Sequence, residues 1–212
     1  MYKIKEEYRR YLPHFQPTNE LAYFVTTRLA NSLPKSIIEQ LHHEHDKSLI
    51  HINQLQLSTE KKSLLTDEQN RRYFGKFDQL LDSQATGHHW FKTPTIAQLA
   101  YDTFLHFHTK RYEMICFTIM SNHVHLLFWL NEDRALYGIM HSWKRYIANK
   151  ANQLLDREGA FWARESYDRA VRNDEELKRI MHYILLNPVK AGIVNNWEDY
   201  PWTFVNEKYF TL

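Results

Sequence analysis

The 212-residue chain is 43% hydrophobic and 15% aromatic, which is enough for a folded core in one domain, or in one domain with an insertion. Its apolar stretches are shorter than the roughly 20 residues of a membrane helix, and its N-terminus has no signal-like apolar run, so we expect a soluble, cytoplasmic protein with no membrane partner. A single cysteine, Cys116, excludes a disulfide framework, and a net charge of +2 restricts any nucleic-acid contact to local basic clusters.

The first part of the chain predicts one strand followed by helices. Residues 21–28 are rich in aromatic and β-branched types, which favours a buried strand. A mainly helical insertion is expected at about 36–93, where Thr66–Gln69 resembles a capping box that would begin a helix over 67–81. Three histidines in its charged first stretch are interpreted as part of a solvated helix face: His42, His43 and His45.

The middle of the chain predicts a helix and then a β-hairpin. After a loop at 84–93, Thr93-Pro94 is typical of a helix start, and this helix is expected to run to about Lys110. Two apolar runs, 112–119 and 123–130, are separated by three residues and indicate paired strands.

The last part of the chain alternates helix and strand. A long helix is expected over about 134–157, a short strand near 166–172, and a final helix from a cap at Asn173 to about Pro188. This order of elements favours an α+β fold, in which an antiparallel sheet has helices packed on one face and the hairpin strands at its centre.

Two histidines in the second strand of the hairpin are candidate metal ligands. Side chains alternate along a strand, so His123 and His125 share a face while Val124 points the other way. The pair His106 and His108 has the same spacing but falls in predicted helix, where residues two apart diverge by about 200°. The alternative for His123 and His125 is a structural role as half-buried histidines.

The final helix offers a tyrosine and an amide on one side. Its apolar residues form a compact stripe, and Tyr183 falls roughly 130° from the centre of that stripe at about 100° per residue. Asn187 follows Tyr183 by one turn and shares its side of the helix. We therefore expect Tyr183 at an edge or cleft, with Asn187 available to give an oxygen to a metal.

Phosphoryl transfer would unite these residues. A tyrosine hydroxyl has a pKa of about 10 and needs help to act as a nucleophile near neutral pH. A divalent metal supplies it by polarising a phosphate and neutralising its charge. Two imidazoles and one oxygen suit Mg²⁺ or Mn²⁺, with Mn²⁺ the better match to nitrogen ligands.

These motifs resemble a known family. His123-Val124-His125 resembles the His-hydrophobic-His (HUH) signature of single-strand DNA endonucleases. The string at 120–127 is similar to the Met-Pro-Asn-His-Val-His-Leu-Leu of REP-associated tyrosine transposases, with Ser121 in place of the proline. Residues 183–192 resemble that family's Tyr-Ile-x-x-Asn-Pro-Val-Lys/Arg-Ala-Gly helix, and further matches in family order lie near both ends of the chain.

The resemblance implies that residues 1–212 form one HUH transposase-like domain with a ferredoxin-like α+β core and the helical insertion at about 36–93. It implies that His123 and His125 bind the metal, Tyr183 is the nucleophile and Asn187 is the third ligand. It also implies cleavage and strand transfer of single-stranded DNA at hairpin-forming repeats, through a 5′-phosphotyrosine, by a monomer or homodimer.

Basic residues interleaved with aromatics are candidates for contacts to single-stranded or hairpin DNA, because they combine phosphate binding with base stacking. The candidates are Arg9, Arg10, Lys144, Arg145, Tyr146 and Lys150. Two other functions stay open: a non-catalytic, domesticated protein that binds hairpin DNA, and a metal hydrolase that uses activated water with Tyr183 in a structural role.

Overall fold

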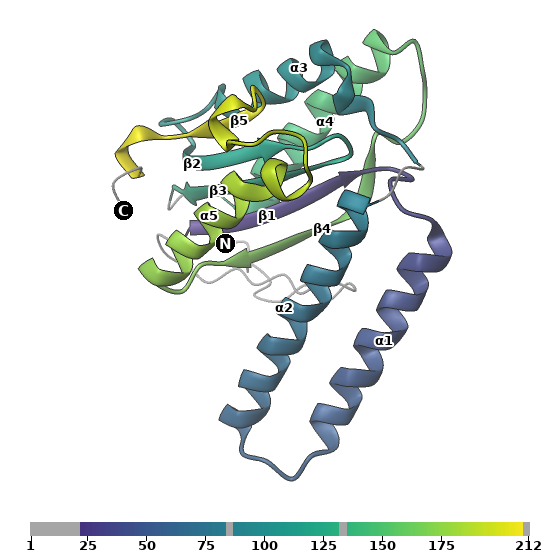
Figure 1. Ribbon diagram of the computed structural model, residues 1–212, viewed down its shortest axis with the longest axis vertical. Coiled ribbons are helices and arrows are strands. Elements are labelled where there is room, and N and C mark those ends of the chain that lie inside the picture. Colours follow the sequence, from purple (N-terminus) through teal and green to yellow (C-terminus); the bar gives the residue numbers. More distant parts are fainter. Residues whose placement is uncertain (1–21, 84–86, 132–134, 210–212) are drawn as a thin grey trace, which may run out of the picture. The chain divides into compact units, whose positions relative to one another are not determined.

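The computed structural model describes residues 22–83, 87–131 and 135–209. Its five strands form one antiparallel sheet in the order β4-β1-β3-β2-β5 (Figure 1). The strands are β1 (Ala22–Leu29), β2 (Tyr112–Ile119), β3 (His123–Leu130), β4 (Trp162–Ala170) and β5 (Thr203–Val205). The first four have the order 4-1-3-2 of a ferredoxin-like core, so the expected α+β class is confirmed, with β3 at the centre.

Helices lie on both faces of this sheet. α3 (Pro94–Leu105) and α4 (Leu136–Leu154) cover one face, as expected, whereas α5 (Asp174–Lys190) crosses the other (Figure 1). The described residues also contain three short 3₁₀ helices: η1 (Trp90–Lys92), η2 (Trp197–Asp199) and η3 (Glu207–Tyr209). No described helix is both long and apolar enough to cross a membrane.

The main core lies between the sheet and the pair α3 and α4. Alternation along β3 sends Val124, Leu126 and Phe128 into this core, where they are fully buried. From α4, Trp143 enters the same layer and donates its indole N–H to the Tyr112 hydroxyl at 3.0 Å. The remaining residues of β3 therefore face α5, and two of these are His123 and His125.

The helical insertion is a second compact unit, residues 31–87. It consists of α1 (Lys35–Gln54) and α2 (Thr59–Ser83). Thr66 lies inside α2, so the capping-box prediction was wrong: the polar run before it is helical as well. His45 is buried and stacks on Tyr73 with ring centroids 4.4 Å apart, so its assignment to a solvated face was also wrong. That the whole chain forms a single domain stays a prediction.

Candidate active site

β3 brings two imidazoles together on the α5 side of the sheet. His123 and His125 have no exposed surface, and their ring centroids lie 4.7 Å apart. Their Nε2 atoms are 3.1 Å apart. Two ligands at right angles around one ion, each at about 2.1 Å, are separated by about 3.0 Å. The spacing of the two nitrogens thus matches neighbouring positions in an octahedral metal site.

The outer nitrogens of both rings are held by polar neighbours. His123 Nδ1 lies 2.6 Å from Asn122 Oδ1, and because an amide oxygen can only accept, the imidazole N–H donates. His125 Nδ1 lies 2.7 Å from the hydroxyl of Thr26, its partner in the register of β1 and β3. Metal-binding histidines are commonly fixed through the nitrogen that does not bind the metal. For His123 this arrangement leaves Nε2 with a lone pair directed at His125.

The Nε2 atoms of His123 and His125 need a cation or a shared proton between them. Two bare lone pairs at 3.1 Å would repel each other in a site from which water is excluded. A proton on one Nε2 relieves the repulsion, and so does a divalent ion bound by both. The residues therefore fit a divalent metal site, without fixing which metal binds.

Helix α5 supplies the third polar group. The Asn173 side chain caps its start by accepting the Glu176 backbone N–H at 2.9 Å, and Ile180 and Ile184 are buried along the helix. One turn further on, Asn187 is 1% exposed, and its Nδ2 lies 3.3 Å from His125 Nε2. A half-turn of this amide group would bring Oδ1 to the same place, so Asn187 can offer an oxygen beside the two imidazoles.

Tyr183 meets the same histidines from α5. Its ring lies edge-on to His125, with centroids 5.5 Å apart, and to Phe24 of β1 at 6.1 Å. The side chain is half-buried, as expected for a residue away from the apolar stripe. The ammonium of Lys190 lies 4.9 Å from the centroid of the Tyr183 ring. The structure thus brings together Tyr183 and the histidine pair, although at least 58 positions separate them in the sequence.

Two other tyrosines, Tyr146 and Tyr167, could compete with Tyr183 as the nucleophile. Tyr167 of β4 also contacts Phe24, with centroids 6.0 Å apart, but only 5% of its surface is exposed. Tyr146 is 51% exposed and lies on α4, on the far side of the sheet from His123 and His125. Tyr183, in contrast, is half-buried and has its ring against His125.

The candidate DNA-binding residues of α4 have two different environments. Arg145, Tyr146 and Lys150 are exposed. The Lys144 ammonium instead donates to the Ala163 carbonyl at 2.9 Å and to the Ser166 hydroxyl at 3.1 Å. Burial, and secondarily the charge of Arg28, lowers the pKa of Lys144 to about 8. All four lie on the helix across the sheet from the histidines, and their contact with DNA stays a prediction.

Arg9 and Arg10, the remaining DNA-binding candidates, lie outside the described residues. Asn122 and Thr26 are partners of the histidines that were not predicted from the sequence. Asn122 could have been found, since it directly precedes His123 in the motif. Thr26 could not, because its place opposite His125 depends on the register between β1 and β3.

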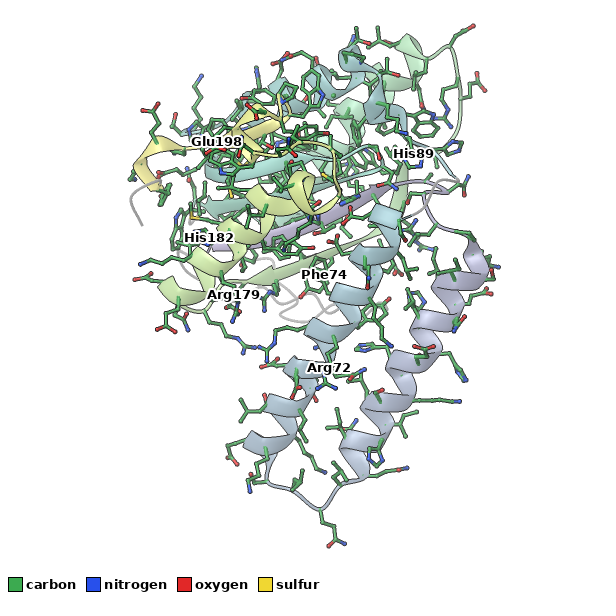
Figure 2. All side chains as sticks on the ribbon, viewed as in Figure 1. Arg72, Phe74, His89, Arg179, His182 and Glu198 are labelled. Carbon is green, nitrogen blue, oxygen red and sulfur yellow. The ribbon has the colours of Figure 1, made fainter. Side chains whose placement is uncertain are left out.

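Other side chains of α5 face away from the histidine site. His182 is exposed, as is Arg179 one turn before it (Figure 2). A groove of about 250 Å³ runs along this side of the helix and is lined by Lys178, Met181, His182, Leu185, Leu186, Trp197 and Tyr209. Tyr183 and Asn187 are not among its lining residues, so the groove is separate from the candidate active site.

Comparison with known proteins places these residues in a family context. Residues 105–187 match the family described as "Transposase IS200 like". A Haemophilus influenzae protein named as a REP-associated tyrosine transposase is 28% identical over 102 residues, which cover 43% of this chain and 58% of that protein. The matched stretch therefore spans little more than half the length of this relative.

A solved structure of a REP-associated tyrosine transposase bound to a REP hairpin is 18% identical, with a TM-score of 0.45, and the match covers 94% of this chain and 82% of that one. The segment that matches the IS200-like transposases contains His123, His125, Tyr183 and Asn187. The resemblance of this chain to the REP-associated tyrosine transposases, expected from its motifs, is confirmed.

Proposed function

We propose that the protein cleaves and rejoins single-stranded DNA at hairpin-forming repeat sequences, with Tyr183 as the nucleophile and with a divalent metal. One observation carries the proposal: the Tyr183 ring lies against His125, whose Nε2 converges with that of His123 at 3.1 Å. The match of residues 105–187 to IS200-like transposases supports it, as does the REP-associated name of the relative.

His123, His125 and the amide oxygen of Asn187 would hold the metal, Mg²⁺ or Mn²⁺, which when bound polarises the scissile phosphate and neutralises part of its charge. Asn122 and Thr26 keep the two imidazoles oriented through their outer nitrogens. The burial of both histidines excludes water from their inner side, which strengthens electrostatic interactions there.

Tyr183 performs the bond exchange in this proposal. Its hydroxyl oxygen attacks phosphorus, and the bond from phosphorus to the 3′ oxygen of the preceding nucleotide breaks. The phenol loses its proton to solvent and the departing 3′ oxygen gains one, so the products are a 5′-phosphotyrosine and a free 3′-OH. Because the phosphotyrosine keeps the energy of the broken phosphodiester, a 3′-OH can reverse the step and join strands without ATP.

Covalent adduct formation tests this function. A labelled hairpin oligonucleotide incubated with wild-type protein and Mn²⁺ should give a protein–DNA band that survives denaturation. Tyr183→Phe should bind the hairpin within about twofold of wild type but form no adduct and no nick, while Tyr146→Phe and Tyr167→Phe keep adduct formation.

The alternatives give different results in the same assay. Binding without cleavage in wild type would indicate a non-catalytic hairpin-binding protein. Cleavage without any adduct would indicate a hydrolase that uses activated water. An adduct that mass spectrometry places on Tyr146 would overturn the assignment of Tyr183.

We further propose that Arg9, Arg10, Arg145 and Lys150 contact DNA phosphates, with Tyr146 stacking on bases and Lys144 as an additional candidate. Each lost phosphate contact should reduce the salt dependence of hairpin affinity by about one unit of log Kd per log salt. Arg145→Ala should show this change without a change in melting temperature. Lys144→Met distinguishes two roles of that lysine. A weaker salt dependence of hairpin affinity supports a contact with DNA. An unchanged salt dependence together with lower stability assigns Lys144 to its contacts with Ala163 and Ser166 alone.

A further inference from the structure

Lys190 lies over the candidate nucleophile. Its Nζ is 4.9 Å from the centroid of the Tyr183 ring. Seven residues advance about 700° around a helix, within roughly 20° of two full turns, so Tyr183 and Lys190 lie on one stripe of α5. Asn187, about 40° from Tyr183, belongs to the same stripe. The helix therefore presents a hydroxyl, an amide and an ammonium along one stripe, on which Tyr183 and Asn187 contact His125.

The position of Lys190 has two ordinary explanations. A cation in the last turn of a helix interacts favourably with the helix dipole, and a cation over an aromatic ring is stabilised by the ring quadrupole. The dipole interaction, however, does not require the side chain to fold back over a residue two turns earlier. Neither explanation depends on the charge of a bound phosphate. An experiment that removes this charge can therefore distinguish both explanations from a role in the reaction.

The chemistry at Tyr183 puts a negative charge within reach of this ammonium. When the tyrosine hydroxyl attacks phosphorus, the two non-bridging oxygens of the phosphate lie near the oxygen-bearing end of the ring. A lysine ammonium is a compact charge on a flexible four-carbon stem, so it can follow the phosphate with small rotations. Lys190 is exposed in the free protein, and entering DNA would cover it and reduce screening by water.

The other charged or titratable groups near Tyr183 either belong to the candidate metal site or are paired with Glu176. His125 faces the ring from β3 and belongs to the candidate metal site. Arg169 of β4 is paired with the buried Glu176 at 2.8 Å, about four turns along α5 from Lys190. Arg179 also bonds Glu176, at 3.4 Å. Lys190 instead has its ammonium over the Tyr183 ring.

We propose that Lys190 binds a non-bridging oxygen of the phosphate that Tyr183 attacks, and so positions this phosphate for the reaction. The proposal rests on the proposed function of Tyr183. It assigns to Lys190 a contact with one phosphate, the scissile one, and not a general attraction for DNA.

A binding cycle that needs no cleavage tests this contact. In the Tyr183→Phe background, which keeps the ring beneath Lys190, hairpin affinity is measured with and without Lys190→Met. Each protein is given two oligonucleotides: one with an ordinary scissile phosphodiester, and one with an uncharged methylphosphonate at that single position. Lys190→Met should weaken binding of the phosphodiester about fivefold and leave binding of the methylphosphonate unchanged within about 1.5-fold.

Two matched variants complete the design. Lys190→Arg should restore most of the affinity for the phosphodiester, because the cation is kept. Lys178→Met removes a lysine of the same helix whose side chain lines the separate groove, and it should affect both oligonucleotides equally or not at all.

Equal weakening of both oligonucleotides by Lys190→Met would overturn the proposal, because the lost contact would then not involve the scissile charge. No weakening of either would also overturn it. The adduct assay judges the function separately: if Tyr183→Phe still forms the covalent band, the assignment of Tyr183 fails whatever the binding cycle shows.

Discussion

Two His-x-His pairs in this chain have the same spacing and different structures. His123 and His125 lie on β3, share a face and bring their Nε2 atoms to 3.1 Å. His106 and His108 follow the end of α3 at Leu105. His106 is exposed with its ring against Phe107, while His108 accepts the Met114 backbone N–H at 3.0 Å.

The difference shows what turns a spacing into a site. A central strand fixes the direction of alternate side chains and gives each residue partners on both sides, so His123 and His125 are buried and oriented by Asn122 and Thr26. After the end of a helix the backbone turns, and each histidine finds its own neighbour. The sequence pattern distinguishes the two pairs, but it predicts His106 and His108 inside a helix that reaches Lys110, and that boundary was wrong because α3 ends at Leu105.

The largest predicted effect separates the two pairs by activity. His123→Ala or His125→Ala should each reduce adduct formation more than about a hundredfold, because loss of a direct ligand should exceed the 10- to 100-fold effect of losing an outer partner. His106→Ala and His108→Ala should leave the adduct rate within about twofold. Circular dichroism on all four variants checks that the fold is kept, and a fully active His123→Ala protein would remove the distinction between the pairs.

The next effect concerns the partners of the buried pair. Asn122→Ala and Thr26→Val remove the hydrogen-bond partners that orient the two imidazoles, so each should weaken Mn²⁺ binding about 10- to 100-fold while leaving some activity at high metal. Titration of adduct formation against Mn²⁺ concentration measures this shift. If the Mn²⁺ concentration for half-maximal adduct formation is unchanged in both variants, burial alone orients the two imidazole rings.

A smaller effect is expected at Asn187. Asn187→Ala should raise the Mn²⁺ concentration for half-maximal cleavage about tenfold, because it removes one neutral oxygen ligand, which water can replace, and leaves both imidazole ligands in place. Asn187→Asp should retain activity because it keeps an oxygen beside His125 Nε2. If Asn187→Ala cuts as well as wild type at limiting Mn²⁺, the third ligand lies elsewhere.

The smallest effect is expected for the pair His106 and His108, and it concerns the free energy of unfolding alone. His108→Ala leaves the buried Met114 N–H without its imidazole acceptor, so the free energy of unfolding should fall by about 1 kcal/mol. Urea denaturation measures this change, and adduct formation by the folded variant should equal that of wild type. A loss of adduct formation without a loss of stability would give this pair an unexpected role.

The sequence predicted the parts of the molecule that depend on local pattern. Two continuous apolar runs located β2 and β3, and the cap at Asn173 located the start of α5. What could not be predicted depends on pairing between distant segments. The three-residue β5 exists because it pairs with β2, and the placement of α5 on the second face follows from packing that no periodicity encodes.

The same division holds for the candidate site. The shared face of His123 and His125 follows from strand alternation, and the common side of Tyr183 and Asn187 follows from helix geometry. That these two faces meet required the sheet order and the position of α5. The motif at 183–192 contains Lys190 but indicates no role for it, because only the structure puts its ammonium over the Tyr183 ring.

Metal binding by the two histidine pairs tests the central claim most directly. Calorimetric titration with Mn²⁺ should give one site in wild type and in the double variant His106→Ala/His108→Ala, with the same affinity within about twofold. The double variant His123→Ala/His125→Ala should show no binding at that site. Equal Mn²⁺ binding by wild type and His123→Ala/His125→Ala would contradict the assignment of this strand-borne pair as the metal site.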